Sequence, residues 1–357
     1  MLRLLHFSSS QTRTLFPLRS SVPGIKRNYL VKCSNTEMVG EYLLSKERKQ
    51  ASLRLCNVSS FMTELLELSA ENPSLHVVII PGNPGVVQFY KHFVEGVYEM
   101  LDGRASVTAI GHISQTKKNW DSNRLFSLQD QIDHKVAFVN QEIQNTEIPI
   151  FLVGHSIGSH MSLEVFRSLP ERVKYCVGLY PFLSSNKESV AQTVIEKISM
   201  SSILCSAISC IVSALGLLPR RLTRFLVKRS VGKSWSTASV EALCGHLLQY
   251  HTMRNILFLA KTEFEKFAQE PDWMFMKEKQ DQISFLFGIN DHWGPLTMFE
   301  EISKQVPNVA LSIEKEGHTH SFSCTKAGSV WVADHVVSLI KHQLQVKADI
   351  VKDTMVG

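Results

Sequence analysis

The amino-acid sequence predicts an α/β fold, with a mostly parallel central sheet, helices on both of its faces and an inserted helical cap. Apolar runs rich in β-branched residues alternate with segments whose apolar residues recur at helical spacing, as expected for strands joined by crossover helices. One apolar run ends in the pattern Gly-x-Ser-x-Gly. Residues 184–280 then interrupt the alternation before the next clear strand. Together these observations predict one large domain that carries an insertion.

The strands are predicted from continuous apolar runs, which are typical of parallel strands buried on both faces. Residues 37–183 form the first part of the predicted core, and residues 281–345 form the second part. Ahead of the core strands, residues 41–68 indicate one or two short strands. The expected core strands are 75–80, 106–110, 150–153, 175–180, 283–287 and 307–313.

Helices are predicted where apolar residues return every three or four positions. Residues 129–145 are one such segment, and their apolar stripe consists of Ile132, Val136, Val139 and Ile143. A second helix is expected at 159–168, and a terminal helix at 330–343. Residues 346–357 are expected to form a C-terminal tail.

Ser156 lies in the pattern Gly154-His155-Ser156-Ile157-Gly158 and is a candidate nucleophile. A strand that turns sharply into a helix exposes a serine hydroxyl at the tip of the turn, as in a nucleophile elbow. Gly154 and Gly158 have no side chains, so the strand and the helix can approach closely. We therefore predict that Ser156 is catalytic, with a structural Gly/Ser turn in another α/β fold as the alternative.

A candidate acid and two candidate bases follow Ser156 along the chain. A serine hydroxyl becomes a good nucleophile when a histidine, oriented by a carboxylate, removes its proton. In α/β-hydrolases the acid and then the histidine come after the serine, each behind a strand. Asp291 comes just after the strand 283–287, and both His318 and His320 follow the last strand. The order of these residues predicts the α/β-hydrolase fold.

The tetrahedral intermediate of acyl transfer needs preorganised N–H donors. One donor is expected from the backbone of Ile157, which follows the nucleophile. The other should come from the turn Pro81–Gly85 after the first core strand. Pro84 has no N–H, so Asn83 is the candidate second donor.

The insertion at 184–280 is predicted to be a cap or lid. It contains Ile198–Leu218, which is twenty-one residues without a charge but with six serines. A basic amphipathic stretch follows, with Arg220, Arg221, Arg224, Lys228 and Arg229 among apolar residues. The segment 198–229 therefore has three interpretations: a cap packed on the pocket, an anchor at a lipid droplet or membrane surface, or a transmembrane helix.

The N-terminal residues 1–36 contain six basic residues and neither Asp nor Glu. This composition is typical of an organelle transit peptide, of plastid or mitochondrial type with the plastid favoured, and a disordered basic tail is the alternative. The formal net charge is +5, and without these six charges it falls to −1, so net charge does not support nucleic-acid binding. Seven widely spaced cysteines without a Cys-x-x-Cys pair indicate free thiols, and no metal site is expected.

Several stretches of the chain, in order, resemble the lipid droplet-associated hydrolases, a family of α/β-hydrolases. The turn Pro81–Gly85 and the helix sequence Gln131-Ile132-Asp133-His134-Lys135 are not general features of α/β-hydrolases, which makes the resemblance specific. The sequence departs from the family pattern at His292, where the family has proline. The stretches that carry the resemblance are 79–85 with Phe89-Tyr90, 131–138, 154–159, 288–293 and 320–322.

The resemblance implies a nucleophile at Ser156 and an acid at Asp291. It favours His320 over His318 as the base, because the family's histidine precedes a small residue and phenylalanine. It also implies residence at lipid droplets, whereas the transit-like N-terminus, unusual for the family, leaves the plastid as an alternative for an organelle-targeted or plant-type member.

The combined prediction is a serine hydrolase that cleaves carboxylic esters of a lipid, of sterol ester or acylglycerol type. It needs no cofactor and works at a lipid droplet or membrane surface. The alternatives are a weakly active or non-catalytic protein that organises lipid droplets, and a hydrolase-fold acyltransferase that uses the same Ser156.

Overall fold

A computed structural model describes residues 49–356 of the chain, so the transit-like segment 1–36 lies outside the described residues. These residues form an eight-stranded sheet in the order β1-β2-β4-β3-β5-β6-β7-β8. The strands β3 to β8 run parallel, and β1 and β2 pair antiparallel at one edge. The strands are β1 (Ser52–Val58), β2 (Phe61–Leu68), β3 (Leu75–Ile80), β4 (Ala105–Ile110), β5 (Ile150–His155), β6 (Val173–Leu179), β7 (Ile283–Gly288) and β8 (Ala310–Glu314).

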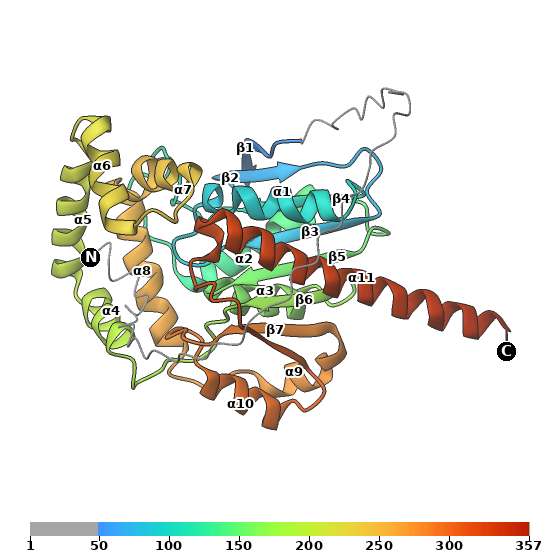
Figure 1. The fold of residues 1–357 in the computed structure, drawn as a ribbon. Helices are drawn as coiled ribbons and strands as arrows, with labels where there is room; N and C mark the ends of the chain where they lie inside the picture. Colours follow the sequence, from blue (N-terminus) through green and yellow to red (C-terminus); the bar gives the residue numbers. More distant parts are fainter. Residues whose placement is uncertain (1–48, 357) are drawn as a thin grey trace, which may run out of the picture. The chain divides into compact units, whose positions relative to one another are not determined.

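Helices cover both faces of the sheet, which confirms the predicted fold class (Figure 1). One face packs on α1 (Lys91–Met100) and α11 (Lys326–Val356), and the other packs on α2 (Leu128–Glu142), α3 (Ile157–Ser168) and α10 (Leu296–Gln305). In β3, Val77 and Ile79 belong to the hydrophobic core on the α1 and α11 face, whereas Val78 and Ile80 belong to the core on the opposite face. This two-sided burial explains why the central strands are continuous apolar runs rather than alternating ones.

Several element ends differ from the prediction. The helix after the elbow begins at Ile157, directly after Ser156, and the last strand begins at Ala310 rather than at residue 307. The terminal helix continues to Val356, through most of the expected tail 346–357. Residues 344–356 contain no glycine or proline, the two residues that most strongly disfavour a helix interior.

The insertion between β6 and β7 forms the lid, which we define as residues 184–280. Figure 1 shows the helices within residues 190–266 gathered beside one end of the sheet. Its helices are α4 (Val190–Met200), α5 (Ser202–Gly216), α6 (Arg220–Val231), α7 (Thr237–Ala242), the π-helical turn η3 (Leu243–Leu247), α8 (Tyr250–Lys266) and α9 (Trp273–Glu278).

Buried polar contacts attach the lid to the rest of the domain. His246 Nε2 lies 2.9 Å from Glu64 Oε2 on β2, and both side chains are buried. Burial raises the pKa of Glu64, but the contact with His246 and a hydrogen bond from Gln88 to the same carboxylate oxygen outweigh it. The pKa of Glu64 therefore lies below its usual range. In the first helix of the lid, α4, Gln192 Nε2 donates to the His292 carbonyl oxygen at 2.6 Å.

The uncharged segment 198–218 is not one helix. It comprises the last turn of α4, a break at Ser201, and α5, and the two helices bend by 99° at this break. Within residues 49–356, no single helix has both the length and the apolar composition of a membrane span; α4 and α5 meet these criteria only as a bent pair.

Candidate active site

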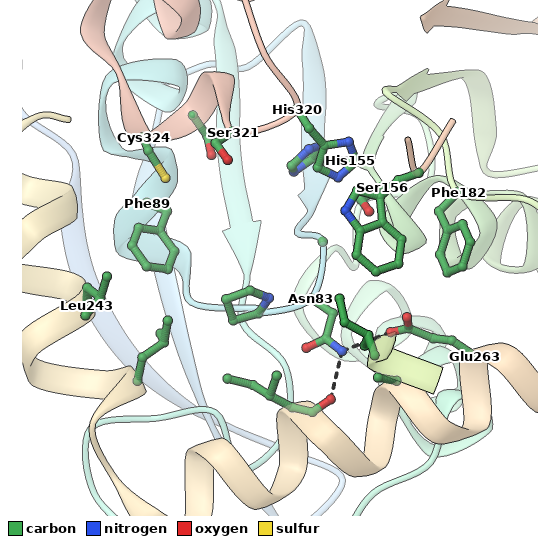
Figure 2. Close-up of a pocket in the computed structure, with 18 of the residues that line it drawn as sticks. Asn83, Phe89, His155, Ser156, Phe182, Leu243, Glu263, His320, Ser321 and Cys324 are labelled. Carbon is green, nitrogen blue, oxygen red and sulfur yellow. Dashed lines mark hydrogen bonds between the residues drawn. The ribbon is translucent and has the colours of Figure 1, made fainter. Parts of the chain in front are cut away.

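The four loops that carry the predicted site residues meet at the carboxyl ends of parallel strands. Asn83 follows β3, Ser156 follows β5, Asp291 follows β7 and His320 follows β8. Parallel strands that are neighbours in a sheet bring these ends to one edge. Asn83, Ser156 and His320 line a single cavity beneath the lid (Figure 2).

Ser156 occupies a strained turn between β5 and α3. Its φ of 57° and ψ of −123° are unusual for a residue with a side chain. A Cβ on Gly154 would lie 2.2 Å from the Gly158 carbonyl oxygen, and a Cβ on Gly158 would lie 2.2 Å from the Ile80 carbonyl oxygen. Both glycines of the pattern are therefore required by close backbone packing, which is the geometry of a nucleophile elbow.

Asp291 and His320 are joined by a hydrogen bond. Asp291 Oδ2 lies 2.8 Å from His320 Nδ1, and the carboxyl side chain is almost fully buried. The other carboxylate oxygen accepts a hydrogen bond from the Trp293 backbone N–H at 3.0 Å, which fixes its orientation. His318 is placed differently, because its ring packs beside Trp331 on α11. The structure thus pairs His320, rather than His318, with Asp291.

Tyr90 links the elbow to the turn after β3, a role that the sequence did not reveal. Its hydroxyl accepts a hydrogen bond from the Gly82 backbone N–H at 3.0 Å and lies 2.6 Å from His155 Nδ1. Burial lowers the pKa of His155 well below its usual range, so its ring is neutral, and burial raises the pKa of Tyr90. A neutral imidazole has one N–H donor and one acceptor nitrogen, so the ring forms this hydrogen bond without carrying a charge.

The turn Pro81–Gly85 lies directly against Ser156. A Cβ on Gly82 would be 3.0 Å from Ser156 Cβ, so the absence of a side chain permits this approach. Within residues 49–356, the backbone N–H groups of Asn83 and Ile157 donate no hydrogen bond to protein. The Asn83 side chain points to the lid instead, where Nδ2 donates to the carbonyl oxygen of Ile256 at 2.9 Å and to Glu263 Oε1 at 3.1 Å.

The Gln131–Lys135 stretch of α2 forms a buried polar layer near this turn. Lys135 Nζ donates to the Gly111 carbonyl oxygen at 2.8 Å and lies 3.2 Å from His134 Nδ1. Burial holds the pKa of Lys135 well below its usual range. His112, which follows Gly111 in the chain, donates its backbone N–H to the Gly85 carbonyl oxygen at 3.1 Å. The layer therefore supports the segment on which the end of the turn rests.

The lid supplies an apolar wall to the cavity. Its contribution includes Ile195, Ile198, Leu243, Leu247, Met253 and Leu257. Glu263 of α8 is the exception, a carboxyl side chain that also lines the cavity. Burial raises the pKa of Glu263 to about 8. No sequence pattern marked this residue, because its position beside Asn83 arises only when the lid folds over the turn.

The described geometry agrees with a comparison against protein families. Residues 73–323 match the model of the lipid-droplet associated hydrolases. The chain belongs to the lipid-droplet associated hydrolase family. Relatives with the name lipid droplet-associated hydrolase include one from Gallus gallus, 28% identical over 70% of this chain and 80% of the relative. Another, from Dictyostelium discoideum, is 24% identical over 73% of this chain and 86% of the relative.

Solved structures share the fold of this family member. A haloalkane dehalogenase variant from Bradyrhizobium elkanii superposes with a TM-score of 0.62, at 13% identity, over 84% of this chain and 99% of the other. A putative lipase from Acinetobacter baumannii superposes with a TM-score of 0.56, at 13% identity, over 83% of this chain and 93% of the other. The comparisons give no support to the plastid alternative.

Proposed function

We propose that this member of the lipid-droplet associated hydrolase family is a serine esterase that cleaves carboxylic esters of lipids. The observation that carries the proposal is the hydrogen bond between Asp291 and His320 in the cavity that holds the elbow serine, Ser156. A serine at a strained turn, a histidine and a buried carboxylate are the three groups that acyl transfer requires.

In the proposed mechanism, Ser156 Oγ attacks the ester carbonyl carbon while His320 Nε2 takes the hydroxyl proton. His320 Nδ1–H donates to Asp291 Oδ2, which keeps Nε2 free and stabilises the imidazolium that forms. Collapse of the tetrahedral intermediate expels the alcohol, which receives the proton from His320. Water, deprotonated by the same histidine, then releases the fatty acid from Ser156.

The backbone N–H groups of Asn83 and Ile157 are the proposed donors to the oxyanion. Their lack of a protein partner within residues 49–356 leaves them available, and Gly82 brings the turn close to Ser156. The Asn83 side chain, which bonds to α8, holds this turn rather than the oxyanion. In other hydrolases one such donor is worth about 3 kcal/mol of transition-state stabilisation.

Replacing Ser156 with alanine is expected to abolish labelling by a fluorophosphonate probe, because the probe reacts with an activated serine hydroxyl. The measurement is in-gel fluorescence of the purified protein after timed exposure to the probe. Ser321→Ala is the matched control, since Ser321 also lines the cavity, and it should retain labelling. Labelling of Ser156→Ala at the wild-type rate would reject Ser156 as the nucleophile.

The outer surface of the lid is proposed to bind a lipid droplet. On α5 the buried side includes Cys205 and Ser209, whereas the apolar residues Ile203 and Ile211 are 81% and 63% exposed. Leu217, just beyond the helix, is 86% exposed. The apolar side chains of α5 therefore face outward and form an exposed apolar stripe on the protein surface. The exposed basic residues of α6 follow this stripe in the chain. An apolar stripe beside cationic groups suits a monolayer with anionic phospholipids.

The combined replacement of Ile203, Ile211 and Leu217 with serine is expected to reduce droplet binding more than tenfold. Each fully buried aliphatic side chain contributes about 1.5–3 kcal/mol to transfer from water. The measurement is flotation with triolein droplets coated by a phospholipid monolayer. Leu53→Ser with Leu55→Ser is the control, because these exposed residues lie on β1, far from the lid in sequence and outside it. Equal flotation of the lid variant and wild type would contradict the proposed surface.

A further inference from the structure

Glu263 is a carboxyl group in an unusual place. It is 3% exposed and lines the cavity from α8, and the other lid residues on this wall have aliphatic, thioether or indole side chains. Within residues 49–356, no lysine, arginine or histidine forms an ion pair with it. A carboxyl in such a setting needs a hydrogen-bonding partner for each oxygen or it incurs a desolvation cost.

Asn83 accounts for one of the two oxygens. Its Nδ2 group has two hydrogens, which are donated to Glu263 Oε1 and to the Ile256 carbonyl oxygen (Figure 2). Glu263 Oε2 forms no hydrogen bond to residues 49–356. It is also not one of the fully buried polar atoms that lack a partner there, so part of its surface is accessible. This oxygen is therefore the atom that a bound molecule can reach.

Glu263 carries its proton at neutral pH, because burial raises its pKa to about 8. Since Oε1 already accepts from Asn83, the proton belongs on Oε2. A neutral carboxyl offers one O–H donor. The cavity that Ser156 lines thus also presents a hydrogen-bond donor, beside the turn that carries a proposed oxyanion donor.

From this arrangement we infer that Glu263 selects acylglycerols over steryl esters, by donating from its second carboxyl oxygen to a glycerol oxygen of the substrate. The inference rests on the proposed esterase function. A glycerol ester has further oxygens within three bonds of the reacting ester linkage, whereas a steryl ester has none. A steryl ester would bury the Glu263 O–H without a partner, and a buried unpaired donor weakens binding roughly tenfold or more.

The decisive comparison uses 1-oleoylglycerol and propyl oleate, which share the acyl chain and a three-carbon alcohol and differ only in the two hydroxyls. Wild type is expected to hydrolyse 1-oleoylglycerol with a kcat/KM about tenfold above that for propyl oleate, and cholesteryl oleate should be the poorest of the three. Equal kcat/KM for the matched pair, or a preference for cholesteryl oleate, would overturn the inference.

Two variants assign the preference to Glu263. Glu263→Met removes the donor at similar volume, and the ratio of kcat/KM for the matched pair should fall to about one. Glu263→Gln keeps an acceptor for Asn83 and an N–H donor for the substrate, so it should restore the ratio. Each ratio compares two substrates within one variant. If Glu263 only holds the lid in place, Glu263→Met would change both values of kcat/KM and leave their ratio as in wild type. That result would refute the assignment.

A binding measurement separates this inference from the esterase proposal. The probes are 1-O-decylglycerol and decyl propyl ether, which cannot be hydrolysed and differ by the same two hydroxyls. Wild type and Glu263→Gln should show a larger rise in Tm with the glycerol ether, and Glu263→Met should respond equally to both. Preference for the glycerol ether without any Ser156-dependent hydrolysis would reject the esterase alone, whereas hydrolysis without that preference would reject the role of Glu263.

Discussion

Replacing His320 with alanine is expected to lower kcat for lipid ester hydrolysis by roughly 10⁴–10⁶-fold, the range seen when a member of a catalytic serine triad is removed. The hydrogen bond from His320 Nδ1 to Asp291 orients the imidazole so that Nε2 can take the Ser156 proton. The neighbouring His155 is a poor substitute base, because burial lowers its pKa well below its usual range and its Nδ1 is engaged by Tyr90. The measurement is steady-state hydrolysis of a p-nitrophenyl acyl ester.

His318→Ala is the matched control for this experiment. It removes a histidine two positions away, whose ring packs beside Trp331 rather than beside Asp291. Its kcat is expected to stay within about threefold of wild type, because exposed or half-buried substitutions away from special features have small effects. A larger loss of kcat in His318→Ala than in His320→Ala would show that the base has been assigned to the wrong histidine.

Replacing Gly158 with alanine is expected to destabilise the domain by about 4 kcal/mol or more, at the upper end of single-residue effects. The added Cβ would lie 2.2 Å from the Ile80 carbonyl oxygen and 2.5 Å from the Pro81 carbonyl oxygen. Both are backbone atoms of the central strand β3 and its turn, so no side chain can rotate to make room. The free energy of unfolding, measured by urea denaturation, should fall accordingly.

Gly245→Ala provides the comparison within the same chain. Gly245 lies in η3 of the lid, and a Cβ there would meet no atom within 4 Å. Alanine is favoured over glycine in a helix by up to about 1 kcal/mol, so this variant should be as stable as wild type or slightly more stable. Equal losses of stability in the two variants would contradict the close packing at the elbow.

The parallel core and the elbow were predictable because their signals are local. The continuous apolar run at 75–80 reflects burial on both faces, and the two glycines around Ser156 reflect close backbone approach within one turn. The β1–β2 hairpin was less visible. Its turn residues Ser59 and Ser60 have φ values of 48° and 74°, a conformation that Asn-Gly would have signalled and that two serines do not.

The choice between the two candidate histidines required information beyond local pattern. Both follow the last strand, and the resemblance to a family favoured His320, but the sequence does not state which ring reaches Asp291. The path of the loop after β8 decides this, and His155, Tyr180 and Trp293 pack around the His320 ring. Contacts between residues far apart in the chain have no signature in spacing.

By itself, then, the sequence determined the fold class, the glycine-flanked serine turn at Ser156, the chain order of the candidate acid and base, and the long insertion after β6. Each of these depends on hydrophobic periodicity or on glycines within a few residues of one another. Only the tertiary structure placed Tyr90 between Gly82 and His155, and Glu263 against Asn83. Residues 83 and 263 are 180 positions apart. They meet because burial of the apolar face of α8 brings the lid onto the turn, and that packing is a property of the whole chain.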